Sequence, residues 1–171
     1  NPFDQPDVQA AKDRTAEVLA SGREPDVGPH GSLEGLFSEA RPGDYVAIQA
    51  FVDPMREPEL EPLIERARSE TGCVVTHGLG PRYLHSTGQL HKGGAPIGCF
   101  VQLTAGHAND LPIPGWHETF GMLIDAQAAG DFISIEAHEL PVARIDLGDD
   151  PAAGLAALRE ALQHALAEPL N

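Results

Sequence analysis

Cysteine, aromatic residues and basic residues are all scarce in this chain of 171 residues. Cys73 and Cys99 are the only cysteines, and they form neither a CxxC pair nor a zinc-ligand spacing. The sequence therefore predicts no disulfide framework, which is typical of the reducing cytoplasm. No apolar run approaches the roughly 20 residues of a membrane helix, so we expect no membrane partner.

Positive charge is also scarce, because 11 lysines and arginines stand against 26 aspartates and glutamates, a net charge of −15. Such a surface repels nucleic acid and anionic lipid, so neither is expected as a partner. A phosphorylated substrate would be repelled at long range as well, so any phosphate site must be locally basic. Aromatics make up 5% of the chain and hydrophobic residues 42%, which predicts an aliphatic core.

Helical and extended patterns alternate along the chain, which predicts an α/β fold with a largely parallel sheet of about four to five strands covered by helices. Gly22, Gly72 and Gly130 are expected to end helices. The expected helices are 6–20, 33–40, 57–70, a helix from Trp116 or Thr119 to Ala129, and 151–167. The expected strands are 45–52, 73–76, 97–103 and 141–147, with 131–135 either a strand or a second helical segment and 78–96 a loop.

The first helix carries a lysine and an amide at helical spacing. Gln5 and Lys12 are seven residues apart, so they lie about two turns apart on one face with Val8 between them. Side chains at that spacing can both reach one small polar ligand, although a solvated lysine explains the pattern as well. The chain starts at Asn1 without an initiator methionine, and we expect it to be part of a longer protein.

This stretch resembles the C-terminal signature of glucose-6-phosphate isomerases, a Phe-Asp-Gln-x-Gly-Val-Glu-x-x-Lys pattern. The matching residues are Phe3, Asp4, Gln5, Val8 and Lys12. Asp7 stands where the family has glycine, and Gln9 where it usually has glutamate. The amino-acid sequences of residues 1–8 and 80–94 are similar to the isomerase portion of bifunctional transaldolase/phosphoglucose isomerase proteins.

The resemblance implies an enzyme that interconverts glucose 6-phosphate and fructose 6-phosphate without a metal or nucleotide cofactor. It implies that Gln5 binds near the sugar phosphate and that Lys12 acts at the ring oxygen during ring opening. It also implies that the carboxylate base lies in upstream isomerase domains, so the chain alone is expected to be inactive. On this basis residues 1–22 form the C-terminal catalytic helix of the isomerase domain, 23–43 a linker and 44–171 an α/β extension.

Residues 71–109 contain no aspartate or glutamate, although acidic residues fill 26 of the 171 positions. This acid-free segment predicts an anion site, because its glycines, hydroxyls and basic side chains are what such a site needs. The candidate residues, expected to converge on one concave surface, are Arg82, His85, Ser86, Thr87, His91 and Lys92. In the rival account, Arg82 and Lys92 point apart and each pairs with an acidic side chain from another element. His85 and His91 have no nearby acid, so no metal site is predicted.

Three hypotheses therefore remain open. The chain is a fragment of the isomerase, a regulatory module that binds an anion or sugar phosphate, or a domain that buttresses the isomerase and its possible homodimer. The sequence alone does not show whether the extension is a regulatory module or a structural buttress.

Overall fold

The computed structural model describes residues 5–21 and 27–167, so Phe3 and Asp4 of the N-terminal motif lie outside the described residues. Four parallel strands form one sheet in the order β2-β1-β3-β4. The strands are β1 (Tyr45–Phe51), β2 (Val74–Leu79), β3 (Gly98–Thr104) and β4 (Val142–Asp146). The prediction of a parallel α/β sheet covered by helices is confirmed.

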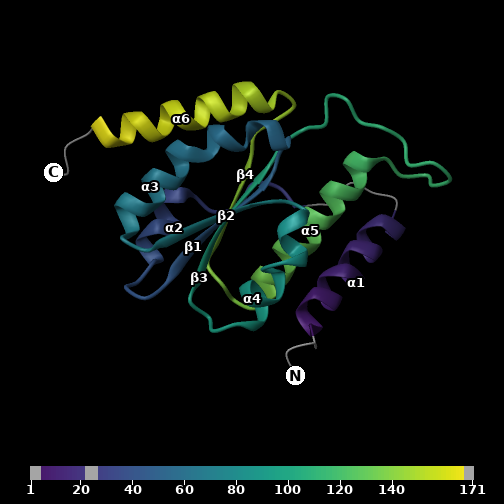
Figure 1. Cartoon of the computed structure of the whole chain (residues 1–171), viewed down its shortest axis with the longest axis horizontal. Coiled ribbons are helices and arrows are strands. Elements are labelled where there is room, and N and C mark those ends of the chain that lie inside the picture. The colour runs from purple at the N-terminus through teal and green to yellow at the C-terminus, as the bar shows by residue number, and fades with distance from the viewer. Residues whose placement is uncertain (1–4, 22–26, 168–171) are drawn as a thin grey trace.

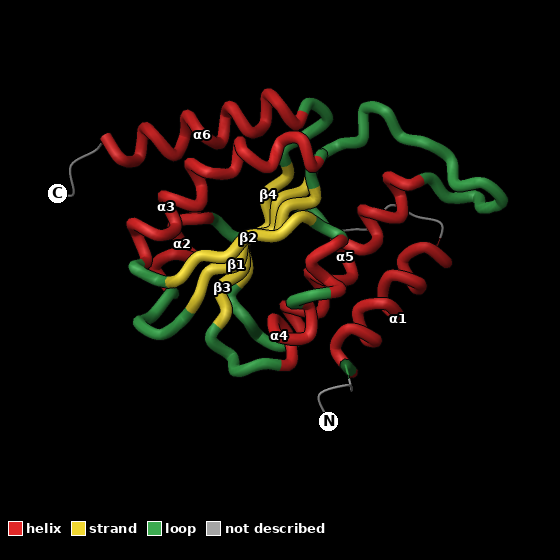
Figure 2. Tube along the Cα trace, viewed as in Figure 1, coloured by secondary structure: helices red, strands yellow, loops and turns green. Residues whose placement is uncertain are grey.

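Helices cover both faces of the sheet (Figure 1). One face carries α2 (Leu33–Glu39), α3 (Glu61–Thr71) and α6 (Pro151–Ala167), and the other carries α1 (Pro6–Ser21), α4 (Gly88–Gly93) and α5 (Phe120–Ala137), as Figure 2 also shows. The chain moves from β1 outward to β2 and then crosses back over β1 to reach β3. Open α/β sheets usually bind ligands where the strand order reverses in this way, at the carboxyl ends of the strands.

The main core is aliphatic, as the scarcity of aromatics predicts. Between the sheet and the α3/α6 layer, Ile48, Leu63, Leu103 and Leu155 are almost completely buried. Each such side chain contributes about 1.5–3 kcal/mol by burial. On the opposite face, the α5 layer packs on polar strand residues as well as on Phe100, so that side of the sheet contains a polar layer.

Two predicted segments differ from the structure. The expected loop 78–96 contains a 3-10 turn, Arg82–His85, followed by the short helix α4. The expected helix 57–70 is divided into a 3-10 turn, Pro54–Leu60, and α3. Pro58 lies inside that 3-10 turn, and proline cannot donate the backbone hydrogen bond that would continue an α-helix through it.

Helix α5 runs through Gly130 and includes residues 131–135, so the predicted helix end at Gly130 is wrong and the strand alternative there is excluded. Gly130 lies where α1 crosses α5. A Cβ at Gly130 would lie 2.9 Å from Thr15 Oγ1 and 3.1 Å from the Ala11 carbonyl oxygen. The glycine therefore permits a close helix crossing rather than ending a helix.

The two N-terminal helices pack onto this same domain. α1, which the sequence analysis assigned to an upstream domain, lies against α5 and α4. α2, within the predicted linker, buries Leu33, Leu36 and Phe37 in the main core. Among the helices of the described residues, none combines the length and apolar character needed to span a membrane.

Candidate functional site

Gln5 and Lys12, the two functional residues that the motif predicts, are both exposed. Gln5 immediately precedes α1, and its carbonyl oxygen accepts the Gln9 N–H at 3.1 Å in the first turn. Between them Val8 is half-buried, while Ala11 is 8% exposed where α1 meets α5. The packed side of α1 thus fixes the helix and leaves the Gln5 amide and the Lys12 ammonium available to a ligand.

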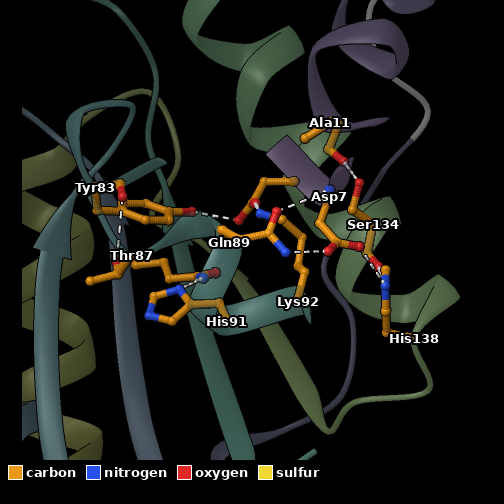
Figure 3. A network of polar contacts seen from close by, with 12 residues as sticks. Asp7, Ala11, Tyr83, Thr87, Gln89, His91, Lys92, Ser134 and His138 are labelled. Carbon is orange, nitrogen blue, oxygen red and sulfur yellow. Dashed lines mark hydrogen bonds and ion pairs between the residues drawn. The ribbon is translucent and has the colours of Figure 1, made fainter. Parts of the chain in front are cut away.

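Asp7 joins α1 to two other helices (Figure 3). Its backbone N–H donates to Gln89 Oε1 at 3.1 Å, and Gln89 Nε2 donates to Asp7 Oδ2 at 2.5 Å. The other carboxylate oxygen, Oδ1, lies 3.0 Å from Nε2 of His138 at the end of α5. These contacts hold α1 beside the acid-free segment.

A hollow of about 110 Å³ lies between α1 and the acid-free segment. This α1 hollow is lined by Val8, Lys12, Leu84, His85, Lys92 and Gln127, with Ala11 and Thr15. Lys12 and His85 are its exposed members that can exchange a proton, whereas Lys92 is buried at its floor. Its volume is well below the roughly 300–1,000 Å³ of typical small-molecule pockets, so these walls alone do not enclose a sugar phosphate.

The six candidate anion-binding residues do not converge on one concave surface. His85 and Lys92 line the α1 hollow. Arg82 lines a different cleft at the carboxyl ends of the strands, and Thr87 and His91 line a third hollow beside β2. Ser86 is exposed, and its hydroxyl donates to the Tyr83 carbonyl oxygen at 3.1 Å. The expected convergence is therefore wrong.

Lys92 pairs with an acidic side chain from another element, as the rival account expected, because its ammonium donates to Asp131 of α5. The side chains of both residues are at most 1% exposed. Tyr83 donates its hydroxyl to the other oxygen of Asp131 at 2.6 Å. The acid that balances Lys92 thus comes from α5, outside the acid-free segment, and this pairing explains how a lysine can be buried there.

Burial shifts the pKa values of the aromatic groups in this network. The pKa of Tyr83 is raised well above its usual value of 10.0, first by burial and then by the charge of Asp131. Burial lowers the pKa of His91 from 6.5 to about 4, so its imidazole is neutral near pH 7. Tyr83 accordingly remains a hydrogen-bond donor, and His91 carries no charge that would attract an anion.

Gln102 and Arg144 extend the polar layer beneath α5, and sequence analysis did not identify either. The guanidinium of Arg144 donates to Gln102 Oε1, and Gln102 Nε2 donates to the Ala128 carbonyl oxygen at 3.0 Å. Burial also lowers the pKa of Arg144. Both residues occupy inward positions on apolar strands, and two isolated polar residues give no periodic signal in the sequence.

A larger cleft than the α1 hollow, of about 580 Å³, lies at the carboxyl edge of the sheet. This carboxyl-edge cleft is lined by Asp53, Arg56, Arg82, His107, Asp110 and Pro151, among others. In the described part of the chain no carboxylate forms an ion pair with Arg82, which is exposed. Arg82 is therefore a cation of this cleft that an anionic ligand would meet without a competing carboxylate among the described residues.

Aspartates cap the helix starts around this cleft. Asp110 Oδ1 accepts the Gly121 N–H of α5 at 2.7 Å, and Asp150 Oδ1 accepts the Ala152 N–H of α6 at 3.0 Å. The pKa of Asp110 is lowered, first by a hydrogen bond from Thr119 and then by that from Gly121. In many folds of this type, backbone N–H groups at helix starts bind a phosphate. Here an aspartate carboxylate already accepts hydrogen bonds from such N–H groups.

Comparison with known proteins shows similarity of fold only. No family model and no curated protein matches the chain. Its structure is similar to that of a hypothetical protein from Thermus thermophilus, with a TM-score of 0.60 and 15% sequence identity. The similarity covers 94% of this chain but 42% of the other, so the chain spans less than half of that protein's length. Within the described residues no cluster of three or more potential metal ligands occurs.

Proposed function

We propose that this chain is the C-terminal part of an aldose–ketose isomerase that interconverts glucose 6-phosphate and fructose 6-phosphate. The observation that carries the proposal is the placement of the motif residue Lys12, exposed at the α1 hollow beside His85. The matched Gln5 is exposed at the start of the same helix. Two groups that can exchange a proton and one amide are thus presented on one side of the domain.

In this proposal Lys12 donates a proton toward the ring oxygen of the cyclic sugar, which opens the ring. His85 is the second group that can exchange a proton in the same hollow, and Gln5 donates hydrogen bonds near the phosphate. Transfer of a proton between C1 and C2 needs a carboxylate base. Asp7 of α1 already binds Gln89 and His138, and the resemblance places the base in the upstream domains.

The base and the remaining walls of the site are therefore assigned to upstream isomerase domains that cover Lys12. The small volume of the α1 hollow supports this assignment, because it leaves most of a hexose phosphate outside these walls. The chain alone is expected to show no isomerase turnover. Turnover from a preparation free of host isomerase would place the base within these residues.

The test is Lys12→Ala in the natural full-length protein, with fructose 6-phosphate formation coupled to a reporter enzyme. Loss of one positioned acid typically lowers kcat by about 10²–10⁴-fold. Arg159→Ala is the matched control, because it removes an exposed cation from α6 on the opposite face of the sheet. An unchanged kcat in Lys12→Ala, or an equal loss in both variants, removes Lys12 from the mechanism.

A sugar-phosphate-binding regulatory module is the second candidate, favoured by Arg82 in the carboxyl-edge cleft, which has no ion-pair partner in the part of the chain that the structure describes. Titration of the chain with glucose 6-phosphate or inorganic phosphate would then perturb residues around Arg82, less so at high salt, and Arg82→Ala would abolish the effect. The aspartate caps of α5 and α6 argue against this candidate. No perturbation in the wild-type chain would leave a structural role for the extension.

A further inference from the structure

A third hollow, of about 220 Å³, lies between the sheet and α4 on the side of the edge strand β2. This β2 hollow is lined by Tyr45, Gln49, Val74, Tyr83, Leu90 and His91, among others. It exists because α4 is a six-residue helix, too short to cover the β2 residues that face it. Val74 is 70% exposed and Leu90 is 59% exposed, so two apolar side chains lie at the opening.

The floor of the β2 hollow contains an unpaired buried acceptor. Gln49 is 1% exposed, and its Nε2 bonds to Nδ1 of His91 at 3.2 Å. Its Oε1 has no hydrogen-bond partner among the described residues. A buried polar atom without a partner is costly, so a native structure usually supplies one from water or a ligand.

Several other polar groups around the hollow already have hydrogen-bond partners. The hydroxyl of Tyr83 donates to Asp131 at 2.6 Å, and Thr87 donates to the Tyr83 carbonyl oxygen at 3.4 Å. His77 bonds to Glu57 at 3.1 Å. Among the buried side-chain atoms of this lining in the described residues, Gln49 Oε1 is the one that lacks a hydrogen-bond partner.

The lining also carries no fixed charge. Among the described residues that form it, none is an aspartate, glutamate, lysine or arginine. Figure 3 shows His91 and Thr87 on the side of the polar network away from Asp7 and His138, so that ion pair lies outside the hollow. A charged ligand would lose its hydration here without gaining a counter-charge from these lining side chains, which disfavours phosphates and metal ions.

Aromatic rings form one wall of the hollow. The ring of His91 lies 6.1 Å from that of Tyr45 and 5.9 Å from that of Tyr83, both at tilts below 40°. A flat ligand ring can pack among such rings with favourable offset or tilted geometry. The volume suits a ligand smaller than a typical drug molecule.

We infer that the β2 hollow is a binding site for a small, uncharged aromatic or heteroaromatic molecule that donates a hydrogen bond to Gln49 Oε1. The ring of the ligand packs against Tyr45 and His91, and its apolar edge meets Leu90 and Val74. The site is separate from the α1 hollow and independent of the proposed isomerase function.

The experiment titrates the whole chain with four probes of similar size and follows backbone and side-chain amide resonances by NMR. Phenol supplies a ring and a donor, anisole lacks the donor, benzoate adds a negative charge and benzylammonium adds a positive charge. We expect phenol to shift the Gln49 side-chain amide and to bind about tenfold more tightly than anisole. Benzoate and benzylammonium are expected to bind more weakly than either.

Two variants locate the binding. Gln49→Leu removes the acceptor and should abolish the preference for phenol over anisole. Leu90→Glu changes the exposed rim, which leaves the fold intact, and should weaken phenol binding severalfold. Met55→Glu is its control, because Met55 is 85% exposed on the 3-10 turn Pro54–Leu60 and lines none of the hollows described above.

Equal binding of phenol and anisole to the wild-type chain would overturn the inference, as would equal binding of benzoate. So would an unchanged phenol affinity in Leu90→Glu. A crystal soaked in phenol provides the final test. Density for water alone on Gln49 Oε1 would assign the hollow to solvent.

Discussion

Asp7 Oδ1 lies 3.0 Å from Nε2 of His138, so the first turn of α1 is joined to the C-terminal end of α5. Asp7 is also one of the two positions at which this chain departs from the isomerase signature that it resembles, which has glycine there. The departure has a structural explanation, because glycine has no side chain to bind Gln89 and His138. Asp7 thereby helps to hold α1, which carries Lys12, against α4 and α5.

The first prediction concerns this contact. Asp7→Ala removes hydrogen bonds to α4 and α5 from a side chain that is 17% exposed, so α1 should detach more often. Charge-assisted hydrogen bonds of this kind contribute about 1–2 kcal/mol when partly exposed, which corresponds to roughly 5–30-fold faster amide exchange in α1. Hydrogen-exchange mass spectrometry measures the change, and β1 and β3 should be unaffected.

Asp13→Ala is the control for this prediction. Asp13 is exposed on α1 and accepts a hydrogen bond only within the helix, from Gln9 at 2.8 Å. It should leave exchange in α1 nearly unchanged. Equal acceleration in both variants would mean that Asp7 acts on helix propensity and not on docking.

The second prediction concerns the helix crossing at Gly130. In Gly130→Ala the new methyl group would lie 2.9 Å from Thr15 Oγ1 and 3.2 Å from the Thr15 nitrogen. The substitution favours α5 itself by about 1 kcal/mol of helix propensity, but it pushes α1 away. Amide exchange in α1 should therefore accelerate while the urea midpoint of the sheet does not fall.

Gly28→Ala serves as the control for Gly130→Ala, because a Cβ at Gly28 meets nothing within 4 Å. The double variant Thr15→Ala/Gly130→Ala removes the nearest clashing atom and should partly restore protection of α1. A lower urea midpoint in Gly130→Ala with α1 still protected would contradict this account.

The sheet was predictable because its signals are local and repeated. Every residue of β3, and every residue of β1 after Tyr45, is buried, so each central strand appears in the sequence as an almost unbroken apolar run. The role of Gly130 was not predictable, because a glycine that ends a helix and one that admits a crossing helix look identical in sequence. The difference lies in α1, more than a hundred residues away.

The candidate sites were predictable only in part. The exposure of Gln5 and Lys12 agrees with their spacing on one side of α1. The lack of acidic residues in the acid-free segment indicated an unusual local charge, but it did not show which acidic residue balances the buried Lys92. The partner of Lys92 is Asp131, 39 positions further along the chain, and composition within a window carries no information about such a contact.

The third prediction tests that buried pair. Lys92→Met leaves the Asp131 carboxylate buried without its counter-charge, and breaking one side of such a pair costs about 3–5 kcal/mol. Lys92→Met/Asp131→Asn removes both charges while an amide oxygen still accepts the hydroxyl of Tyr83. The double variant should therefore be more stable than the single one.

Urea denaturation measures these differences in the free energy of unfolding. Arg56→Ala is the control, because it breaks an exposed ion pair with Glu59, which usually contributes below about 1 kcal/mol. If Lys92→Met costs no more than Arg56→Ala, the pair is not a buried charge pair in solution.

The fourth prediction follows from the neutral, buried His91. Burial lowers its folded-state pKa from 6.5 to about 4, so as the pH falls the unfolded chain takes up a proton before the folded protein does. The contribution of His91 to stability is therefore fully present above pH 6.5, declines between 6.5 and about 4, and is constant below that. At about 1.36 kcal/mol per pKa unit, the total loss is about 3 kcal/mol.

His91→Gln isolates this effect, because glutamine can keep a hydrogen bond to Gln49 but does not titrate. The other histidines, and the neighbouring charges of Lys92 and Asp131, are the same in both proteins and cancel in the difference. Urea denaturation from about pH 7.5 to about pH 4.5 should show the wild type losing stability more steeply than His91→Gln, by up to one proton per molecule. The variant is expected to be the less stable protein at the upper end of this range, with the gap narrowing or reversing at the lower end. Parallel stability curves would mean that His91 titrates in the folded protein as it does in the unfolded chain, and then the floor of the β2 hollow would be open to water.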